Sequence, residues 1–315
     1  MRHDVAIIGG GRWGRVILSV LATSDLPVDR ITLVTTHNAA LAHNVVSRLA
    51  SNHPIRIVSE LSDGPSVAII ANAARSHGET ARNLIARGAH LLIEKPVVLT
   101  LPEARQLLSQ ARAARTILLA GLSYRFCSYL RNFARRIEPL RPLTGFNLCW
   151  TDPAGEIRYG EKITYDATIN VADDVMPHIW AILSVLFPQA VFSVKSCRMA
   201  RGGKSATFTL SADGMKGSVT LERDGDRRRR IIQLSAPGSL DFSVEPGTMT
   251  IGAETLTADS DWANSPWPLA RQLRYFLECV EQGKIAGDDE TALLESVRLA
   301  ESASALFNSR VPVEG

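Results

Sequence analysis

The chain has 315 residues, which is enough for two domains of ordinary size. Its composition, 45% hydrophobic and 21% charged, excludes a disordered or fibrous protein and indicates a soluble globular one. The formal net charge is only +3, so neither nucleic acid nor an anionic membrane is expected as a partner.

The first 122 residues alternate short, continuously apolar runs with amphipathic segments. Such runs are typical of parallel strands that are buried on both faces. We predict strands at 5–8, 31–35, 55–58, 67–71, 90–93 and 116–120, and helices at 13–23, 39–50, 76–87 and 101–114. Strands and helices that alternate in short steps predict an α/β domain with a doubly wound parallel sheet at residues 1–122.

After about residue 122 the apolar residues recur with period two. Gly and Asp at the bends then indicate a mainly antiparallel sheet within an α+β domain at residues 123–315. We predict strands at 145–151, 191–197, 206–211, 217–222, 230–235 and 240–244, and helices at 174–187, 269–281 and 289–307.

One dense basic run, residues 227–230, follows the turn-like sequence Asp224, Gly225 and Asp226. Since it lies between two alternating segments, we interpret it as a solvated hairpin tip rather than a polyanion site.

Cys127, Cys149, Cys197 and Cys279 are scattered among apolar residues with no C-x-x-C spacing, as buried reduced cysteines are. The first apolar run is too short for a signal peptide, and no run of about 18 apolar residues could span a membrane. We therefore expect a cytoplasmic protein.

A glycine turn joins the first predicted strand to the first helix. Gly9, Gly11 and Gly14 give the pattern G-x-G-x-x-G, with Arg12 and Trp13 between the last two glycines. In this context Gly9 permits a tight turn, Gly11 lets the backbone approach a pyrophosphate, and Gly14 lets helix and strand pack closely. The partial positive charge of the helix N-terminus then favours the phosphates. The turn therefore predicts a bound nicotinamide dinucleotide rather than a merely flexible loop.

The end of the second predicted strand bears on the choice of cofactor. A carboxylate there would bind the ribose 2′-hydroxyl of NAD, but this chain has Thr35, Thr36 and His37. Hydroxyl and imidazole groups can donate hydrogen bonds to a 2′-phosphate, and Arg12 could add charge. We therefore favour NADP, with NAD as the alternative.

Glu94, Lys95 and Pro96 end a predicted buried strand, at the edge where open α/β sheets place their ligands. A lysine there can donate to a substrate oxygen, and a low-dielectric surrounding would make its proton easier to lose. From the spacing alone, a surface lysine at a strand end is an equal alternative.

Together, the glycine turn, residues 71–77, Glu94-Lys95-Pro96 and residues 121–126 resemble the glucose-fructose oxidoreductase, inositol dehydrogenase and rhizopine catabolism (Gfo/Idh/MocA) family. The resemblance implies a first domain that binds NAD or NADP and a second, open-faced antiparallel sheet whose outer face often forms a dimer, hence a homo-oligomer (dimer or tetramer). It places a small-molecule substrate between the domains. It also implies cofactor contacts at Ala71, Asn72, His77, Glu94 and Lys95 and substrate contacts at Tyr124 and Arg125.

The family's second-domain signature, an Asp four residues before a His, is matched by Asp174 and His178. Spacing of i, i+4 places both on one helical face. By resemblance, Lys95 and His178 form the proton-transfer pair and Asp174 orients the substrate. A histidine packed inside a helix is the alternative for His178.

The segment departs from the family pattern in its intervening residues, Val175, Met176 and Pro177. Pro177 is expected to kink the helix or to lie in its first turn, which makes Asp173 a rival for the role of Asp174. Tyr165, with neighbours up to residue 170, could line the pocket instead of a glycine-rich approach. The substrate therefore stays open among a sugar, an amino sugar, a ketone and a cyclic imine.

Three functions are compatible with these features. The first is an NAD(P)-dependent oxidoreductase that acts on a carbonyl, carbinol or imine without a metal, because the histidines and cysteines show no ligand spacing. The second is a non-catalytic sensor or co-regulator with the same fold. The third is a Rossmann oxidoreductase of another family, which would need the parallel pattern to continue beyond residue 122.

Overall fold

The structure, a computed structural model, describes residues 2–62, 64–158 and 160–310. The chain folds into two units. The first comprises Met1–Ser123, Tyr165–Ile169 and Trp267–Val297, and the second comprises Tyr124–Thr164, Asn170–Pro266 and Arg298–Gly315. The first boundary between the units, after Ser123, is close to the predicted boundary at residue 122. Two later segments return to the first unit, which a single boundary does not allow.

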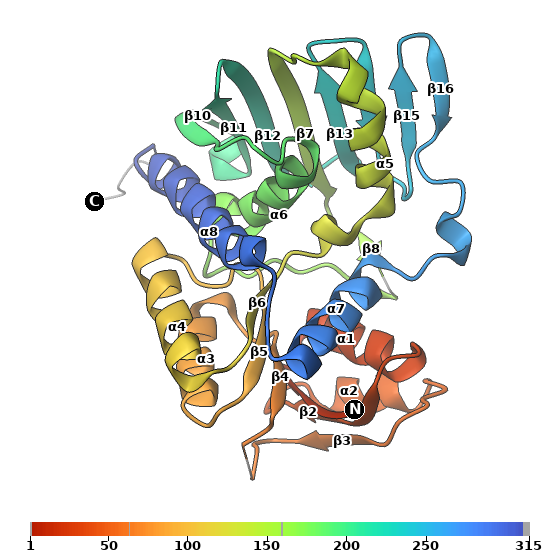
Figure 1. The fold of residues 1–315 in the computed structure, drawn as a ribbon, viewed down its shortest axis with the longest axis vertical. Coiled ribbons are helices and arrows are strands. Elements are labelled where there is room, and N and C mark those ends of the chain that lie inside the picture. Colours follow the sequence, from red (N-terminus) through yellow and green to blue (C-terminus); the bar gives the residue numbers. More distant parts are fainter. Residues whose placement is uncertain (1, 63, 159, 311–315) are drawn as a thin grey trace. The chain divides into compact units, whose positions relative to one another are not determined.

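The first unit contains a six-stranded, all-parallel sheet in the order β3-β2-β1-β4-β5-β6 (Figure 1). Its strands are β1 His3–Ile8, β2 Val28–Val34, β3 Ile55–Val58, β4 Val67–Ile70, β5 His90–Glu94 and β6 Leu118–Gly121. The central strands are apolar on both faces, because Val67 and Ile69 enter one core while Ala68 and Ile70 enter the other. This is the doubly wound α/β sheet that the sequence predicts.

Helices cover both faces of this sheet. They are α1 Arg12–Thr23, α2 Ala39–Val46, α3 His77–Ile85, α4 Leu101–Ala114 and α7 Pro268–Gln282, with the short helix η1 Ala74–Ser76 before α3. One core contains residues of α1 and α7, which lie side by side in Figure 1. The other contains α3, α4 and the first half of α8, Gly287–Asn308. Helix α7 thus completes the first domain from the far end of the sequence.

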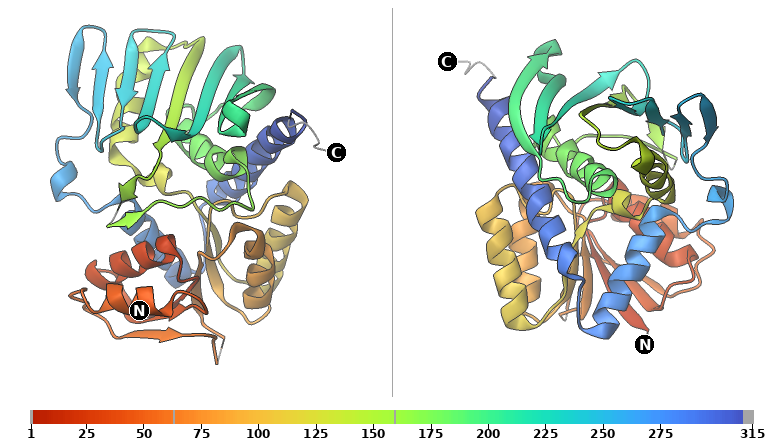
Figure 2. Two further views of the ribbon diagram at one scale, coloured as in Figure 1. Left: turned by 180° about the vertical axis from the view of Figure 1, so that it is seen from behind. Right: turned by 45° about the horizontal axis from the view of Figure 1, so that its top comes forward.

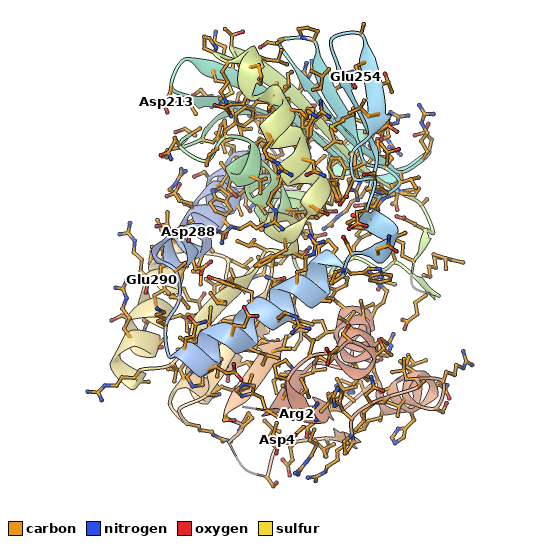
Figure 3. All side chains as sticks on the ribbon, turned by 45° about the vertical axis from the view of Figure 1, so that its right-hand side comes forward. Arg2, Asp4, Asp213, Glu254, Asp288 and Glu290 are labelled. Carbon is orange, nitrogen blue, oxygen red and sulfur yellow. The ribbon has the colours of Figure 1, made fainter. Side chains whose placement is uncertain are left out.

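The second unit contains an eight-stranded sheet in the order β10-β11-β12-β7-β13-β14-β15-β16. Its strands are β7 Gly145–Pro153, β10 Ser193–Ala200, β11 Ser205–Ala212, β12 Met215–Gly225, β13 Arg229–Leu234, β14 Gly238–Asp241, β15 Thr248–Ile251 and β16 Glu254–Thr257. All neighbours are antiparallel except β7 and β12, which pair in parallel. Asp213 and Glu254, labelled in Figure 3, lie at the β11–β12 and β15–β16 turns.

One face of the second sheet packs against helices, and the other is open. Helices α5 Ser128–Ile137 and α6 Val171–Leu186 lie on the first face, whereas Figure 2 shows the opposite face without a helix in the described ranges. The short helices η2 Ser123–Phe126, η3 Glu138–Leu140, η4 Arg201–Gly203 and η5 Trp262–Asn264 and the small ribbon of β8 Ile157–Arg158 and β9 Glu161–Lys162 complete this unit. The open-faced, mainly antiparallel sheet is confirmed.

Two local predictions in the second unit are wrong. The basic run 227–230 is not a hairpin tip, because β12 and β13 do not pair with each other but flank β7 on either side. Helix α6 begins at Val171 rather than Asp174. Pro177 therefore lies in the helix interior and not in the first turn. Since proline has no N–H, the hydrogen bond from residue 177 to the Asp173 carbonyl is missing.

Candidate functional site

Close packing explains two of the three glycines in the turn between β1 and α1. Gly9 adopts φ +120°, and a Cβ there would lie 2.6 Å from the Ala71 backbone at the end of β4. A Cβ at Gly14 would lie 1.9 Å from the Gly9 carbonyl oxygen. Both positions therefore exclude any side chain. Ala71 contributes to this site through its backbone.

Gly11 differs, because a Cβ added there would meet no atom within 4 Å. It is the N-cap of α1 with ordinary angles, φ −62° and ψ 176°, so no backbone strain requires glycine. The space beside it opens toward the helix N-terminus, whose first N–H groups have no acceptor within the helix. Such a cradle fits a diphosphate. The buried Arg15 supports the turn by donating from Nη1 to the Gly10 carbonyl at 2.6 Å.

The loop after β2 contains the side chains that we expected to meet the 2′-position. Thr35 is buried under the turn, since a Cβ on Gly10 would lie 2.4 Å from its hydroxyl oxygen, and that hydroxyl accepts from the Asn38 N–H at 3.2 Å. The Thr35 side chain therefore points into the fold, and its contact with a 2′-phosphate stays a prediction. Thr36 and His37 are exposed.

His77 links the loops that follow β4 and β5. Its Nδ1 lies 2.8 Å from the Pro96 carbonyl oxygen and its Nε2 lies 3.2 Å from the Asn72 carbonyl oxygen. Desolvation lowers the pKa of the imidazole, although both carbonyl contacts act in the opposite direction. The Asn72 side chain in turn donates to the Thr80 hydroxyl at 3.0 Å. His77 is thus buried and connects these two loops through its ring nitrogens.

Glu94 ends β5 in a buried position. A Cβ on Gly121 would lie 2.8 Å from its Cα, so the glycine at the end of β6 makes room for it. Burial raises the pKa of the Glu94 carboxyl to about 7, while the neighbouring Trp13 side chain and the charge of Lys95 act in the opposite direction. Lys95 itself is half-buried at the carboxyl end of the strand, before the cis peptide bond to Pro96.

The raised pKa of Glu94 makes stability depend on pH. Because the folded carboxyl holds its proton up to about pH 7 and an unfolded one only to about 4.5, the free energy of unfolding falls as pH rises between these values. The total change is about 3 kcal/mol. We expect Glu94→Gln to remove this loss and to exceed wild-type stability at pH 8. Urea unfolding from pH 5 to 8 measures it, with the exposed Glu79→Gln on α3 as control; equal slopes in all three proteins would contradict the assignment.

The segment Tyr165–Ile169 belongs to the first unit although the sequence predicts it in the second. Asp166 accepts from the Ala74 N–H at 3.3 Å and from the Thr168 hydroxyl at 2.6 Å, and Arg75 donates to the Thr168 carbonyl at 2.8 Å. These contacts fasten the segment to η1, beside the Asn72 loop. Tyr165 is half-buried there.

In the second unit, Asn170 caps α6 by accepting from the N–H groups of Ala172 and Asp173 at 2.8 and 3.0 Å. It therefore fixes the N-terminus of the helix. Asp173 is buried, whereas Asp174 is partly exposed and accepts from Arg223 of β12 at 2.9 Å. Of the two rivals, Asp174 is the one on the same helical face as His178.

His178 is half-buried, with aromatic rings on two sides. Its imidazole stacks on Trp150 of β7 with centroids 5.2 Å apart and planes 16° apart. Tyr124 of η2 meets it edge-on at 5.2 Å. Tyr124 is itself buried, which raises the pKa of its hydroxyl well above the usual range. Tyr124 thus forms a wall beside His178, and its neighbour Arg125 is partly exposed.

The expected solvated arginine run contains one of the most buried side chains of the chain. Arg230 is 2% exposed and lies with its guanidinium carbon 3.6 Å from the Trp150 ring centroid. It donates to the Thr151 carbonyl at 2.7 Å and forms an ion pair with Asp152. Desolvation lowers the pKa of Arg230 and the Asp152 charge acts in the opposite direction. Only Arg227, at the start of the run, is exposed.

The structure thus brings the predicted residues together in two groups. The first unit holds the glycine turn, Asn72, His77, Glu94 and Lys95, and the second holds Tyr124, Asp174 and His178. Sequence reasoning missed Trp150, Asp152, Arg223 and Arg230. One signal could have found Arg230: it shares its face of the predicted strand 230–235 with Ile232, so the alternation directs it inward.

Among the described residues, both metal-ligand clusters and membrane-spanning helices are absent. No cluster of three or more His, Cys, Asp or Glu side chains there could hold a metal ion. None of the helices there combines the length and apolar character needed to cross a bilayer. Three of the four reduced cysteines are buried, and Cys149 is partly exposed on the open face of the sheet.

The match to a known protein family concerns the N-terminal part of the first unit. Residues 3–122 match the family model described as an oxidoreductase family with an NAD-binding Rossmann fold, the Gfo/Idh/MocA model. None of the curated proteins compared matches the sequence.

Solved structures resemble the chain over nearly its whole length. A UDP-N-acetylglucosamine 3-dehydrogenase from Acidithiobacillus ferrooxidans is 17% identical, with a TM-score of 0.69 and 99% of each chain covered. A 3-ketoreductase from Actinomadura kijaniata, in complex with TDP-benzene and NADP, is 14% identical, with a TM-score of 0.76 and 96% and 97% covered. A protein from gentamicin A biosynthesis, in complex with NAD, is 17% identical, with a TM-score of 0.72 and 98% and 94% covered. At such identities the likeness shows a shared fold.

Proposed function

We propose that this chain transfers a hydride between a nicotinamide cofactor and a small carbonyl, carbinol or imine substrate. The proposal starts from the N-terminal domain, which matches the Gfo/Idh/MocA family of NAD-binding oxidoreductases. The observation that carries the proposal is the open space at Gly11, beside the N-terminus of α1. Packing requires glycine at positions 9 and 14, whereas no contact in the described structure requires it at position 11, and the open space there fits a ligand that approaches from outside the chain.

Different residues of the chain bind the two ends of that cofactor. The turn and the α1 N-terminus bind the diphosphate, and the Asn72, His77 and Lys95 loops border the redox end. When bound, the nicotinamide supplies or accepts the hydride. In the reducing direction the substrate carbon gains a hydride and its oxygen or nitrogen gains a proton. Lys95 and His178 are the groups that we propose to move this proton.

Asp174 is proposed to orient the substrate next to His178. Its carboxylate already accepts from Arg223, and a carboxylate has further lone pairs with which to accept from a substrate hydroxyl. The ion pair with Arg223 holds this carboxylate in a fixed direction. Arg223 thereby joins the residues on which the orientation depends.

The first substrates to test follow from the structural neighbours. Two of them are, by name, a 3-dehydrogenase of a UDP-amino sugar and a 3-ketoreductase seen with a TDP compound. We therefore propose a sugar or amino sugar carbinol and its ketone as the leading class, ahead of simple ketones and cyclic imines. The test is NADPH and NADH oxidation, and the reverse reaction, over a panel of these compounds. Turnover supports the enzyme; tight cofactor binding with no turnover over the whole panel would favour a non-catalytic sensor.

The cofactor preference is proposed to lie with Thr36 and His37. Both are exposed in the loop after β2 and neither repels a 2′-phosphate. We expect Thr36→Asp to weaken NADPH binding by about 10-fold or more and to favour NADH, because a carboxylate repels the phosphate but accepts from the ribose hydroxyls. Calorimetric titration with both cofactors measures this, and Thr32→Asp on β2 is the control. An unchanged NADPH to NADH ratio would refute NADP specificity at this loop.

A homo-oligomer that forms through the open face of the second sheet is part of the proposal. That face has a hollow of about 480 Å³ whose lining includes both apolar and polar residues, among them Ile231, Thr220 and Gln233. Light scattering of the purified protein decides the point, with a monomeric mass as the contrary result. We further propose that the protein acts in the cytoplasm.

A further inference from the structure

The His178 imidazole packs against two aromatic rings, of which Trp150 is nearly parallel to it. The two rings are within 16° of parallel with centroids 5.2 Å apart, while Tyr124 closes one edge. A histidine on a helix otherwise turns about two side-chain bonds. A group that transfers a proton must hold its nitrogen within hydrogen-bond reach of the substrate, so the orientation of this ring has a direct effect on rate.

The Trp150 indole in turn contacts a carboxylate and a cation. Its indole N–H donates to Asp152 Oδ2 at 3.1 Å, while Asp152 Oδ1 accepts from Arg230. The Arg230 guanidinium lies over the indole ring at 3.6 Å. Asp152 thus fixes both the edge of the indole and the cation on its face.

A buried arginine here is costly for stability alone. Arg230 is 2% exposed on the inner face of the sheet, where its strand neighbour Ile232 is fully buried. Well-packed apolar residues in place of a buried ion pair are often neutral or stabilising. Arginine, however, offers a planar group that stacks on an aromatic face and a fork that grips a carboxylate. Its presence therefore indicates a task other than filling the core.

We propose that Trp150 and Arg230, both bound by Asp152, form a platform that sets the orientation of the His178 imidazole. Trp150 and Arg230 are thus positioning residues for proton transfer. This inference rests on the proposed function, in which that imidazole moves the substrate proton. The platform lies wholly within the second unit and includes no residue of the cofactor turn.

The geometry is tested first without any substrate. The chain has seven histidines, and in a ¹H–¹³C spectrum His178 is assigned by the resonance that His178→Asn removes. We expect this resonance to be shifted upfield by the Trp150 ring and to move back toward the position of a free histidine in Trp150→Leu. The matched control is Phe146→Leu, which also removes a buried aromatic ring from the inner face of β7 but one that stacks on Phe187. A His178 resonance that Trp150→Leu leaves in place overturns the platform.

The role in positioning is tested next by kinetics. We expect Trp150→Leu to lower kcat by about 10- to 100-fold with KM within about threefold, because the ring is misplaced while the substrate still binds. Trp150→Phe restores part of kcat, and Arg230→Lys falls below wild type because an ammonium does not stack as a planar group. Phe146→Leu keeps the wild-type kcat. If Trp150→Leu does not fold, Arg230→Lys and Arg230→Met carry the same comparison.

These outcomes distinguish a failure of the positioning role from a failure of the proposed function. A shifted His178 resonance with unchanged kcat in Trp150→Leu would show a structural contact only and would overturn the positioning role. Wild-type protein that turns over no substrate in the panel would overturn the proposed function, and the positioning role with it, even where the spectrum shows the stacked ring. Loss of kcat and of the upfield shift together, with Phe146→Leu normal, supports the platform.

Discussion

Replacement of Lys95 by methionine is expected to lower turnover by about 10³-fold while cofactor affinity stays within about threefold of wild type. Lys95 is half-buried at the end of β5, and methionine keeps the length of its stem while removing the proton. The result rests on general acid or base chemistry at this position, where a proton must move with the hydride. Steady-state kinetics with the best substrate of the panel, together with calorimetric titration of NADPH, measures the two quantities separately.

A second substitution, Lys95→Arg, separates proton transfer from simple charge. Arginine keeps the positive charge but does not release its proton in proteins. We expect it to be as inactive as the methionine variant. The control is Lys284→Met, an exposed lysine of the same unit, which should leave kcat unchanged. Retention of more than about a tenth of wild-type turnover in Lys95→Met would remove Lys95 from the mechanism, because general catalysis contributes at least about 10².

Two alanine substitutions in the glycine turn are expected to fail in opposite ways. Gly14→Ala would place its Cβ 1.9 Å from the Gly9 carbonyl oxygen, so the backbone must shift, and we expect a loss of about 3 kcal/mol in stability. Gly11→Ala meets no protein atom within 4 Å, and the extended backbone at this position, φ −62° and ψ 176°, is open to alanine, so the stability of the variant should be close to that of wild type. Its cofactor affinity should nevertheless fall by about 100-fold, since the methyl group fills the space through which the pyrophosphate approaches.

Urea unfolding and calorimetry with NADPH measure both effects on the same preparations. The Gly11 variant is the informative one, because a normally folded protein that has lost its ligand cannot be explained by misfolding. Wild-type affinity in Gly11→Ala would show that nothing approaches the backbone at this turn. A destabilised Gly11→Ala would show that the space beside it is needed by the fold.

The first domain could be predicted from sequence because its signals are local. Strands that are buried on both faces form continuous apolar runs, as 67–70 does, and the glycine turn joins strand to helix within six residues. The contribution of α7 to this domain could not be predicted. Its apolar face shows that it packs against something, but only tertiary contacts with α1 decide that the partner is the Rossmann sheet.

The site of the second domain was only partly predictable, for a related reason. The pair Asp174 and His178 follows from helical spacing, but their partners Arg223 and Trp150 come from strands that are distant in sequence. Arg230 was misread because charge density suggests solvent, whereas Asp152 supplies the compensating charge from another strand. The burial of Thr35 could not be predicted either, because it follows the end of β2, where the alternation of the strand no longer gives the side-chain direction.

The most direct test of the central claim, that this chain binds a nicotinamide cofactor for hydride transfer, is an experimental structure of its complex with NADP. In this complex we expect the diphosphate within hydrogen-bond distance, about 3 Å, of the backbone N–H groups at the start of α1, beside Gly11. We also expect the nicotinamide ring next to the Lys95 side chain, with Thr36 and His37 near the 2′-phosphate. A dinucleotide bound elsewhere, or one whose nicotinamide lies away from Lys95, would contradict it.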